Sequence, residues 1–162
     1  MKHILFCAAL LVSVMGFSAC TNCPITDTGR FNRNQYHDDG WIAQTGDTYS
    51  YRSKVGSVRN DVLDFDVRNF YGRETVWTLQ LASAGTLGVD ARFVLSDGAL
   101  CKLCLVDKGT QAVTTLAEAG RTLPTSFALS AGSYSIKLVG YGAGGSIQVN
   151  LDAPAGLHPV SD

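Results

Sequence analysis

Histidine is scarce in this sequence, and the short motifs that mark common enzyme families are missing. The 162 residues include three His, and no G-x-S-x-G, H-E-x-x-H or P-loop pattern occurs. His3 lies in an N-terminal segment with the features of a leader, while His37 and His158 lie in segments without a predicted strand or helix. A nucleophile and its general base need a rigid scaffold that holds them within hydrogen-bond distance. We therefore expect no enzymatic activity.

The sequence also lacks an excess of positive charge and a second long apolar run. It has 13 Lys and Arg against 14 Asp and Glu, a formal net charge of −1. Nucleic-acid-binding surfaces depend on clustered positive charge, so this balance argues against a nucleic acid partner. After Cys20 no apolar run approaches the roughly 20 residues that a membrane-spanning helix needs. Any membrane attachment is then expected at the N-terminus.

The N-terminal segment has the layout of an export signal that ends at a lipidated cysteine. Lys2 supplies the positive charge, the apolar run over residues 4–15 contains a single Ser, and small residues precede Cys20. Such a run is typical of a secretory signal and is too short for a retained transmembrane helix. Residues 17–20, Phe-Ser-Ala-Cys, resemble the lipobox of bacterial lipoproteins, with Phe in the place usually taken by Leu. The alternative is an ordinary signal peptidase site after Ala19, which would release a soluble protein.

Lipidation at Cys20 would divide the chain into a leader, a tether, one domain and a tail. The tether is polar and has no sustained periodicity, although its aromatic residues Tyr36 and Trp41, with Ile42, could pack on the domain. A bacterial lipoprotein carries three acyl chains, and each buried methylene adds roughly 0.8 kcal/mol to membrane binding. Because Thr21 follows Cys20 where Asp would signal retention, the enterobacterial sorting rule indicates the outer membrane. The expected boundaries are 1–19 for the leader, 20–45 for the tether, 46–152 for the domain and 153–162 for a loose tail.

Apolar residues alternate with polar ones in several short segments of the expected domain. In the segment DVLDFDVRN, three apolar side chains share one face and the carboxylates of Asp64 and Asp66 share the other. ETVWTLQLAS, SYSIKLV and SIQVNL repeat the pattern, and Gly-bearing turns such as SAGS and GAGGS lie between segments. Alternation of period two marks strands with one buried and one exposed face. Roughly seven to nine such strands predict a single all-β domain, an antiparallel β-sandwich or jelly roll, with one short helix over 114–120.

The order of these segments resembles the bacterial pre-peptidase C-terminal domain family. The likeness covers residues 46–151 and depends on an Asp-x-x-x-Phe-x-Val strand, a Val-Asp-x-Gly strand end and a Leu-x-Ala-Gly-x-Tyr-x-Ile-x-Leu ending. The matching residues are Asp61, Phe65, Val67, Val106, Asp107, Gly109, Leu129, Ala131, Gly132, Tyr134, Ile136 and Leu138. The chain departs from the family in a longer middle segment and in Ala-Leu-Cys-Lys at 99–102, where the family has Gly-Asp-Ala-Asp. The resemblance implies a jelly-roll appendage of secreted enzymes, often proteases, that binds a polymer or a neighbouring protein, with calcium in some members.

Three cysteines remain once the leader is removed and Cys20 is lipidated: Cys23, Cys101 and Cys104. Cys101 and Cys104 have C-x-x-C spacing, but their segment is strand-like, whereas redox pairs with a low thiol pKa lie at helix N-termini. Residues three apart in a strand are separated by roughly 10 Å and point to opposite faces, while a disulfide needs Cα atoms within about 7 Å. Either the chain bends so that Cys101 and Cys104 pair, or one of them pairs with Cys23. Export favours such a structural disulfide over redox catalysis or a zinc site.

A calcium site is a weaker alternative that the aspartates allow. The candidate ligands are Asp38, Asp39, Asp47, Asp61 and Asp107, but calcium takes about six to eight oxygen ligands and no EF-hand spacing is present. Aspartate in turns mainly accepts local backbone hydrogen bonds. We therefore expect no bound metal or other cofactor.

The candidate binding residues are exposed strand side chains and tyrosines near turns. Asp64 and Asp66 lie on a predicted solvated face, which is a more common role for them than a catalytic carboxylate pair. Tyr71 and Tyr141 lie near predicted turns, and tyrosine is a favoured interface anchor because it combines contact area with a polar end. The same rings could instead cover the ends of the sandwich.

These features together predict a membrane-anchored, non-catalytic binding module. Its expected partner is a protein or an extracellular polymer, and its expected roles are adhesion or service as an accessory subunit of a secreted protease complex. The alternative is a periplasmic envelope protein with a structural or enzyme-inhibitory role.

Overall fold

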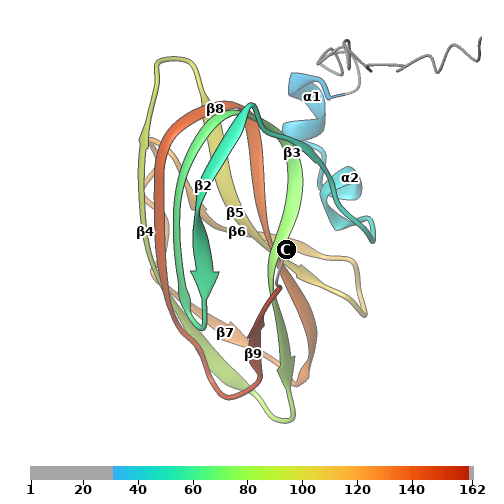
Figure 1. Cartoon of the computed structure of the whole chain (residues 1–162). Coiled ribbons are helices and arrows are strands. Elements are labelled where there is room, and N and C mark those ends of the chain that lie inside the picture. Colours follow the sequence, from blue (N-terminus) through green and yellow to red (C-terminus); the bar gives the residue numbers. More distant parts are fainter. Residues whose placement is uncertain (1–30, 161–162) are drawn as a thin grey trace, which may run out of the picture.

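The period-two segments form strands in the computed structural model, which describes residues 31–160 (Figure 1). Within that range the strands are β1 (Thr48–Ser50), β2 (Ser53–Arg59), β3 (Val62–Leu81), β4 (Gly85–Leu95), β5 (Leu100–Asp107), β6 (Val113–Glu118), β7 (Ser126–Leu129), β8 (Gly132–Asp152) and β9 (Leu157–Pro159). Two short helices, α1 (Arg33–Tyr36) and α2 (Asp39–Ala43), precede them. Every strand pair is antiparallel. The predicted all-β antiparallel sandwich is confirmed.

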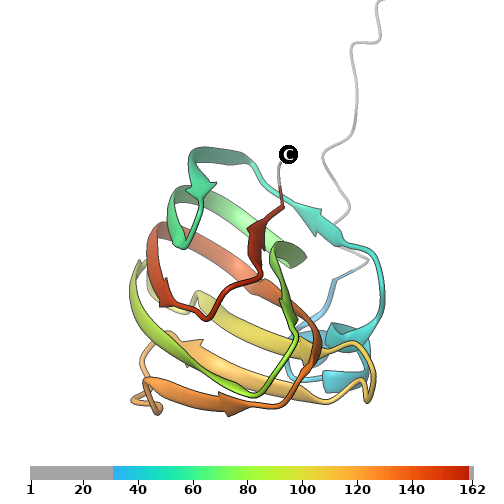
Figure 2. The same ribbon diagram turned by 90° about the horizontal axis from the view of Figure 1, so that it is seen from below.

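Two long strands, β3 and β8, connect both layers of the sandwich. The first half of β3 pairs with β2 and with the second half of β8, which also pairs with β4. The second half of β3 pairs with β1, β9 and the first half of β8, which also pairs with β5. Register shifts between Val67 and Phe70 mark the place where β3 turns from one layer to the other. Figure 2 shows the layers curving around a shared interior.

The sequence patterns did not predict that β3 and β8 each continue through a bend as one strand. DVLDFDVRN and ETVWTLQLAS were predicted as separate strands, and GAGGS was predicted as a turn. The structure contradicts this, because β3 and β8 each run through the bend without leaving the ladder. Asn69, with a φ of 50°, and Gly145, with a φ of 133°, supply the backbone conformations that the bend needs.

The main core lies between the two layers and follows the predicted alternation. Leu63, Phe65 and Val67 of β3 are buried, while Asp64 and Asp66 between them are exposed. In the same cluster these side chains meet the second half of β3 and strands β4, β5, β6 and β8. The fully buried Trp77 donates its indole N–H to the carbonyl of Asn60, 2.6 Å away, so its one polar atom is satisfied. Burial of these alternate positions stabilises the sandwich.

Residues 31–45 of the predicted tether contain two helices that were not predicted, and they pack on the domain through Tyr36, Trp41 and Ile42 as the sequence suggested. Asn32 caps α1 in a capping box with Gln35, and Asp38 caps α2 by accepting a hydrogen bond from the Trp41 N–H, 3.0 Å away. Tyr36 and Ile42 are fully buried in a second apolar cluster on the outer face of β5 and β8. The helices therefore form part of the folded domain (Figure 1), because this face would otherwise expose apolar side chains to water. No helix in residues 31–160 is long and apolar enough to cross a membrane.

Two further local predictions are wrong at the edges of the sheet. The segment 114–120, predicted as a helix, lies mostly in β6, which pairs with β5. The expected loose tail contains β9, which pairs with β3 and places Leu157 against the main core. In both places hydrogen bonds from a neighbouring strand override a weak local preference.

Candidate functional site

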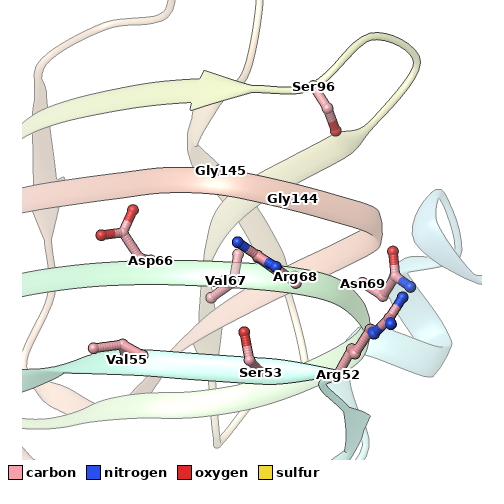
Figure 3. Close-up of a pocket in the computed structure, with 10 residues that line it drawn as sticks. All are labelled: Arg52, Ser53, Val55, Asp66, Val67, Arg68, Asn69, Ser96, Gly144 and Gly145. Carbon is pink, nitrogen blue, oxygen red and sulfur yellow. The ribbon is translucent and has the colours of Figure 1, made fainter.

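A groove of about 630 Å³ lies on the outward face of β2, β3 and β8, at the end of that face nearest the bend (Figure 3). Backbone and side chains from four segments of the chain form it. The lining residues are Arg52, Ser53, Val55, Asp66, Val67, Arg68, Asn69, Ser96, Gly144 and Gly145. Asp66 is thus the one candidate binding residue from the sequence that lies in this groove.

The groove is hollow because β8 has glycine where other strands carry side chains. A Cβ at Gly145 would lie 2.1 Å from the carbonyl oxygen of Val94, so this glycine is required by the close approach of β4. A Cβ at Gly144 would lie 3.4 Å from the Ser96 hydroxyl, which is an ordinary contact. The Ser96 N–H donates to the Gly144 carbonyl over 2.8 Å and fixes the loop after β4 beside the groove. Gly144 therefore keeps the groove open without being needed for the backbone conformation.

Two arginines give the groove its charge. The backbone N–H of Arg52, just before β2, donates to the carbonyl of Arg68 on β3 over 2.8 Å, which holds the two residues side by side. Both side chains are exposed, and among residues 31–160 neither is within 4.0 Å of a carboxylate. Asp66 is the single acidic lining residue, so two positive charges and one negative charge leave the groove at +1. Figure 3 shows Arg68 between Asp66 at one end and Arg52 with Asn69 at the other.

Tyr71 and Tyr141 lie away from this groove. They are register partners on β3 and β8, and their rings meet edge to face with centroids 5.4 Å apart. Both are half-buried beside the second apolar cluster, where Phe31 lies 6.1 Å from the Tyr141 ring. The structure therefore does not join the predicted tyrosines and the predicted aspartates into one site.

A layer of three buried cations lies beneath the helices. Lys102 lies over the Tyr36 ring at 4.8 Å, Arg73 lies over the Trp41 ring at 4.0 Å, and Lys137 donates to the Gln44 carbonyl over 2.6 Å. Burial lowers the pKa of Arg73, and burial together with the charge of Arg73 lowers the pKa of Lys137. Within the described chain Arg73 Nη1 has no hydrogen-bond partner. These contacts attach the helical segment to the sheet.

Glu74, which follows Arg73 on β3, carries a buried carboxylate on the inner side of that strand. Glu74 accepts hydrogen bonds from the Tyr51 hydroxyl and from Lys54 Nζ, the latter over 2.7 Å. Burial, and then the charge of Glu74, raises the pKa of Tyr51. Lys54 and Tyr51 therefore satisfy the carboxylate of Glu74, which gives this charge a structural role.

The C-x-x-C pair is not a disulfide in the structure. Cys101 and Cys104 are free and fully buried, with Cys101 in the main core and Cys104 in the second cluster. The bend that would let them pair is absent, because both lie within β5 and point to opposite faces. Burial raises the pKa of the Cys104 thiol to about 12 and that of Cys101 further. Pairing with Cys23 and lipidation of Cys20 concern residues outside the described range, and both stay predictions.

The aspartates considered for calcium either accept hydrogen bonds from nearby residues or lie apart from one another. Asp47 accepts hydrogen bonds from the N–H and the hydroxyl of Thr75, at 2.9 and 2.7 Å. Asp107 accepts from the Gly109 and Thr110 N–H groups, and these bonds lower its pKa. In the described part of the chain no three His, Cys, Asp or Glu side chains are grouped to hold a metal ion. His37 follows α1 and His158 lies in β9, and both are exposed.

Comparison with protein-family models, curated proteins and solved structures found no match for this chain. The resemblance to the pre-peptidase C-terminal domain stays a prediction.

The sequence contained a partial signal for the groove. Alternation in DVLDFDVRN places Arg68 on the same face as Asp64 and Asp66, so its exposure could have been inferred. Arg52 and Gly144 gave no such signal, since their proximity to Arg68 depends on strand register across nearly the whole domain.

Proposed function

We propose that the protein is a membrane-anchored, non-catalytic binding module that holds its partner in the groove beside Arg52 and Arg68. The observation that carries this proposal is the groove itself, with two unpaired guanidinium groups and several neutral hydrogen-bonding side chains around a glycine floor. Surfaces of this kind recognise a ligand by charge and hydrogen bonding and need no reacting group.

The lining residues favour binding over catalysis. None of the ten is His, Cys, Lys or Glu. Ser53 and Ser96 are the only hydroxyl side chains in the lining, and neither hydroxyl has a general base as a hydrogen-bond partner within residues 31–160. Activated serine requires such a base.

The predicted lipid anchor and the family resemblance support the same role. A lipid at Cys20 would keep the domain at a membrane surface, where a polymer or a secreted protein is at hand. The resembled family consists of appendages that bind a polymer or a neighbouring protein. Adhesion and service to a secreted protease are both compatible with this groove.

A side chain placed in the groove tests the proposal. Gly144→Leu should fill the space beside Ser96 and reduce binding of the detergent-solubilised protein to isolated envelope polysaccharide or secreted protein fractions at least tenfold. Gln148→Leu is the matched control, because Gln148 is exposed on the same strand outside the groove. Equal thermal stability of both variants shows that the fold is intact. If Gly144→Leu binds as well as the natural protein, the partner lies elsewhere.

A further inference from the structure

Arg52 and Arg68 are exposed and have no ion pair within residues 31–160, as is also true of Arg59 and Arg92, but only Arg52 and Arg68 line the groove. Arg121 pairs with Glu118 at 2.6 Å and Lys54 pairs with Glu74 at 2.7 Å. Arg52 and Arg68 are adjacent, have the same charge, and meet no carboxylate within 4.0 Å in the described chain. Both guanidinium groups line the same groove, and their positive charge favours an oxyanion there. Each guanidinium presents a planar set of donors that matches a carboxylate or a phosphate.

The rest of the lining selects among anions. Asp66 stands beside Arg68 and would repel a densely charged polyanion, but its carboxylate can accept a hydrogen bond from a hydroxyl group. Ser53, Ser96 and Asn69 add neutral donors and acceptors around the same space. A ligand that carries both a carboxylate and several hydroxyl groups satisfies all of these side chains. Sugar acids have this combination on every unit.

The surroundings of the groove argue against a peptide as ligand. Extended peptides commonly add to a free sheet edge, whereas the groove lies over a sheet face. Of its strands in the described chain, β3 and β8 are paired on both sides and β2 is paired with β3 alone. Its apolar lining consists of Val55 and Val67, without an aromatic pocket for a side-chain anchor. The glycines at 144 and 145 instead allow a sugar ring to approach the backbone of β8.

We propose that the groove binds carboxylate-bearing units of an acidic polysaccharide, with Arg52 and Arg68 as the carboxylate-binding residues and Asp66 as a hydroxyl acceptor. This inference rests on the proposed function, because it names the ligand class of the same groove.

The test uses the full-length protein in neutral detergent and three probes of similar length: oligogalacturonate, neutral dextran oligosaccharides and dextran sulfate. Titration calorimetry should show binding of oligogalacturonate that weakens as salt increases, at least tenfold weaker binding of dextran sulfate, and none of neutral dextran. The double variant Arg52→Gln/Arg68→Gln should lose oligogalacturonate binding at least tenfold. Arg59→Gln/Arg92→Gln is the matched control, since both arginines are exposed on the same face outside the groove.

Several outcomes would overturn the inference. If both double variants lose oligogalacturonate binding equally, the polymer is attracted by the general positive charge of this face and does not bind in the groove. Dextran sulfate binding as tight as oligogalacturonate would remove the role given to Asp66. If oligogalacturonate does not bind but Gly144→Leu still weakens the binding of envelope material, the ligand class is rejected and the proposed binding module stands. If Gly144→Leu binds envelope material as well as the natural protein does, the binding module in this groove is rejected as well.

Discussion

At the scale of single residues, burial changes the chemistry of side chains that the sequence presents as reactive. The thiols of Cys101 and Cys104 and the hydroxyls of Tyr36 and Tyr51 all have raised pKa values, with burial as the largest cause. A thiol must ionise to act as a nucleophile or metal ligand. The C-x-x-C pair of this chain is therefore a structural element of two apolar clusters.

The buried cysteines predict a loss of stability at alkaline pH. An unfolded thiol ionises near its ordinary pKa of 9.0, whereas the folded Cys104 thiol stays protonated up to about pH 12. The contribution of the two thiols to the free energy of unfolding is fully present below pH 9.0. It is lost as pH rises from 9.0 toward the folded pKa values, by up to about 1.4 kcal/mol per pH unit for each thiol. Chemical denaturation between pH 7 and about 10.5 should show this decline, and Cys101→Ala/Cys104→Ala should flatten it.

Lys137 should change the pH dependence of stability in the opposite direction in the same experiment. Its pKa is lowered by burial, so the unfolded state binds the proton more tightly and stability rises with pH up to its ordinary pKa of 10.5. Lys137→Met should therefore steepen the alkaline decline. An unchanged slope in both variants would contradict the assignment of these groups.

The hydrogen bond from Tyr51 to Glu74 is the second residue-scale prediction. Tyr51→Phe keeps the ring stacked on Phe70, with centroids 4.4 Å apart, but removes a donor to a buried carboxylate. The free energy of unfolding in urea should fall by about 1.5–3 kcal/mol. Tyr71→Phe is the control, because the Tyr71 hydroxyl has no hydrogen-bond partner in the described chain and should change stability by less than about 0.5 kcal/mol. Similar values for both variants would mean that Glu74 is satisfied by Lys54 alone.

At the scale of elements, two features depart from simple strands: the bend shared by β3 and β8, and the helical segment before β1. The bend requires special backbone geometry at Asn69 and Gly145. The helical segment is short and polar in sequence, and its order derives from contacts with the sheet.

Gly145 tests the bend. Gly145→Ala would place a Cβ 2.1 Å from the Val94 carbonyl oxygen, so strands β4 and β8 would have to separate. We expect a loss of more than about 3 kcal/mol or failure to fold. Gly98→Ala is the control, since Gly98 also has a positive φ, of 74°, but open space around its Cα, and only the backbone strain of about 1–2 kcal/mol applies. Thermal denaturation of both variants compares them, and equal losses would show that close approach is not the cause.

Removal of the helical segment tests its place in the domain. A chain that begins at Gly46 lacks Phe31, Tyr36 and Ile42, and it exposes Cys104 and Val139 of the second cluster. Each buried apolar side chain contributes about 1.5–3 kcal/mol, so the melting temperature should fall by more than about 10 °C relative to a chain that begins at Pro24. Equal melting temperatures would restore the interpretation of residues 20–45 as a simple tether.

At the scale of the whole molecule, the two outward faces of the sandwich differ in what covers them. One face is covered by α1 and α2, which contain the first described residues of the chain (Figure 1). The other carries the groove and is open to solvent. A lipid before the helical segment would thus attach the domain through the covered face and leave the groove free for a partner.

Lipidation is the corresponding prediction. Cys20→Ser should abolish incorporation of labelled fatty acid and move the protein from the detergent phase to the aqueous phase in phase partitioning. Cys23→Ser is the control and should keep the lipid, because the lipobox-like residues precede Cys20. Unchanged partitioning of Cys20→Ser would reject the anchor.

Much of the fold was determined by the sequence itself, through the alternation of apolar and polar residues. In DVLDFDVRN the two-residue period of a strand assigns each side chain to a face, and Leu63, Phe65 and Val67 are buried as predicted. The same geometry places Cys101 and Cys104 on opposite faces of a regular strand, although the sequence left open a bend that would let them pair. The all-β class follows from such local patterns because they depend only on neighbours along the chain.

Only the tertiary structure decided how these strands continue, which polar segments become ordered and where the groove lies. The register of β3 with β8 pairs Val67 with Gly145, and residues almost 80 positions apart in sequence thereby form one surface. The helices at residues 33–43 are too short to be stable alone and depend on the apolar face that β5 and β8 present. Long-range pairing has no local signature, so the proximity of Arg52 and Arg68 to Gly144 became visible only once the strands were placed side by side.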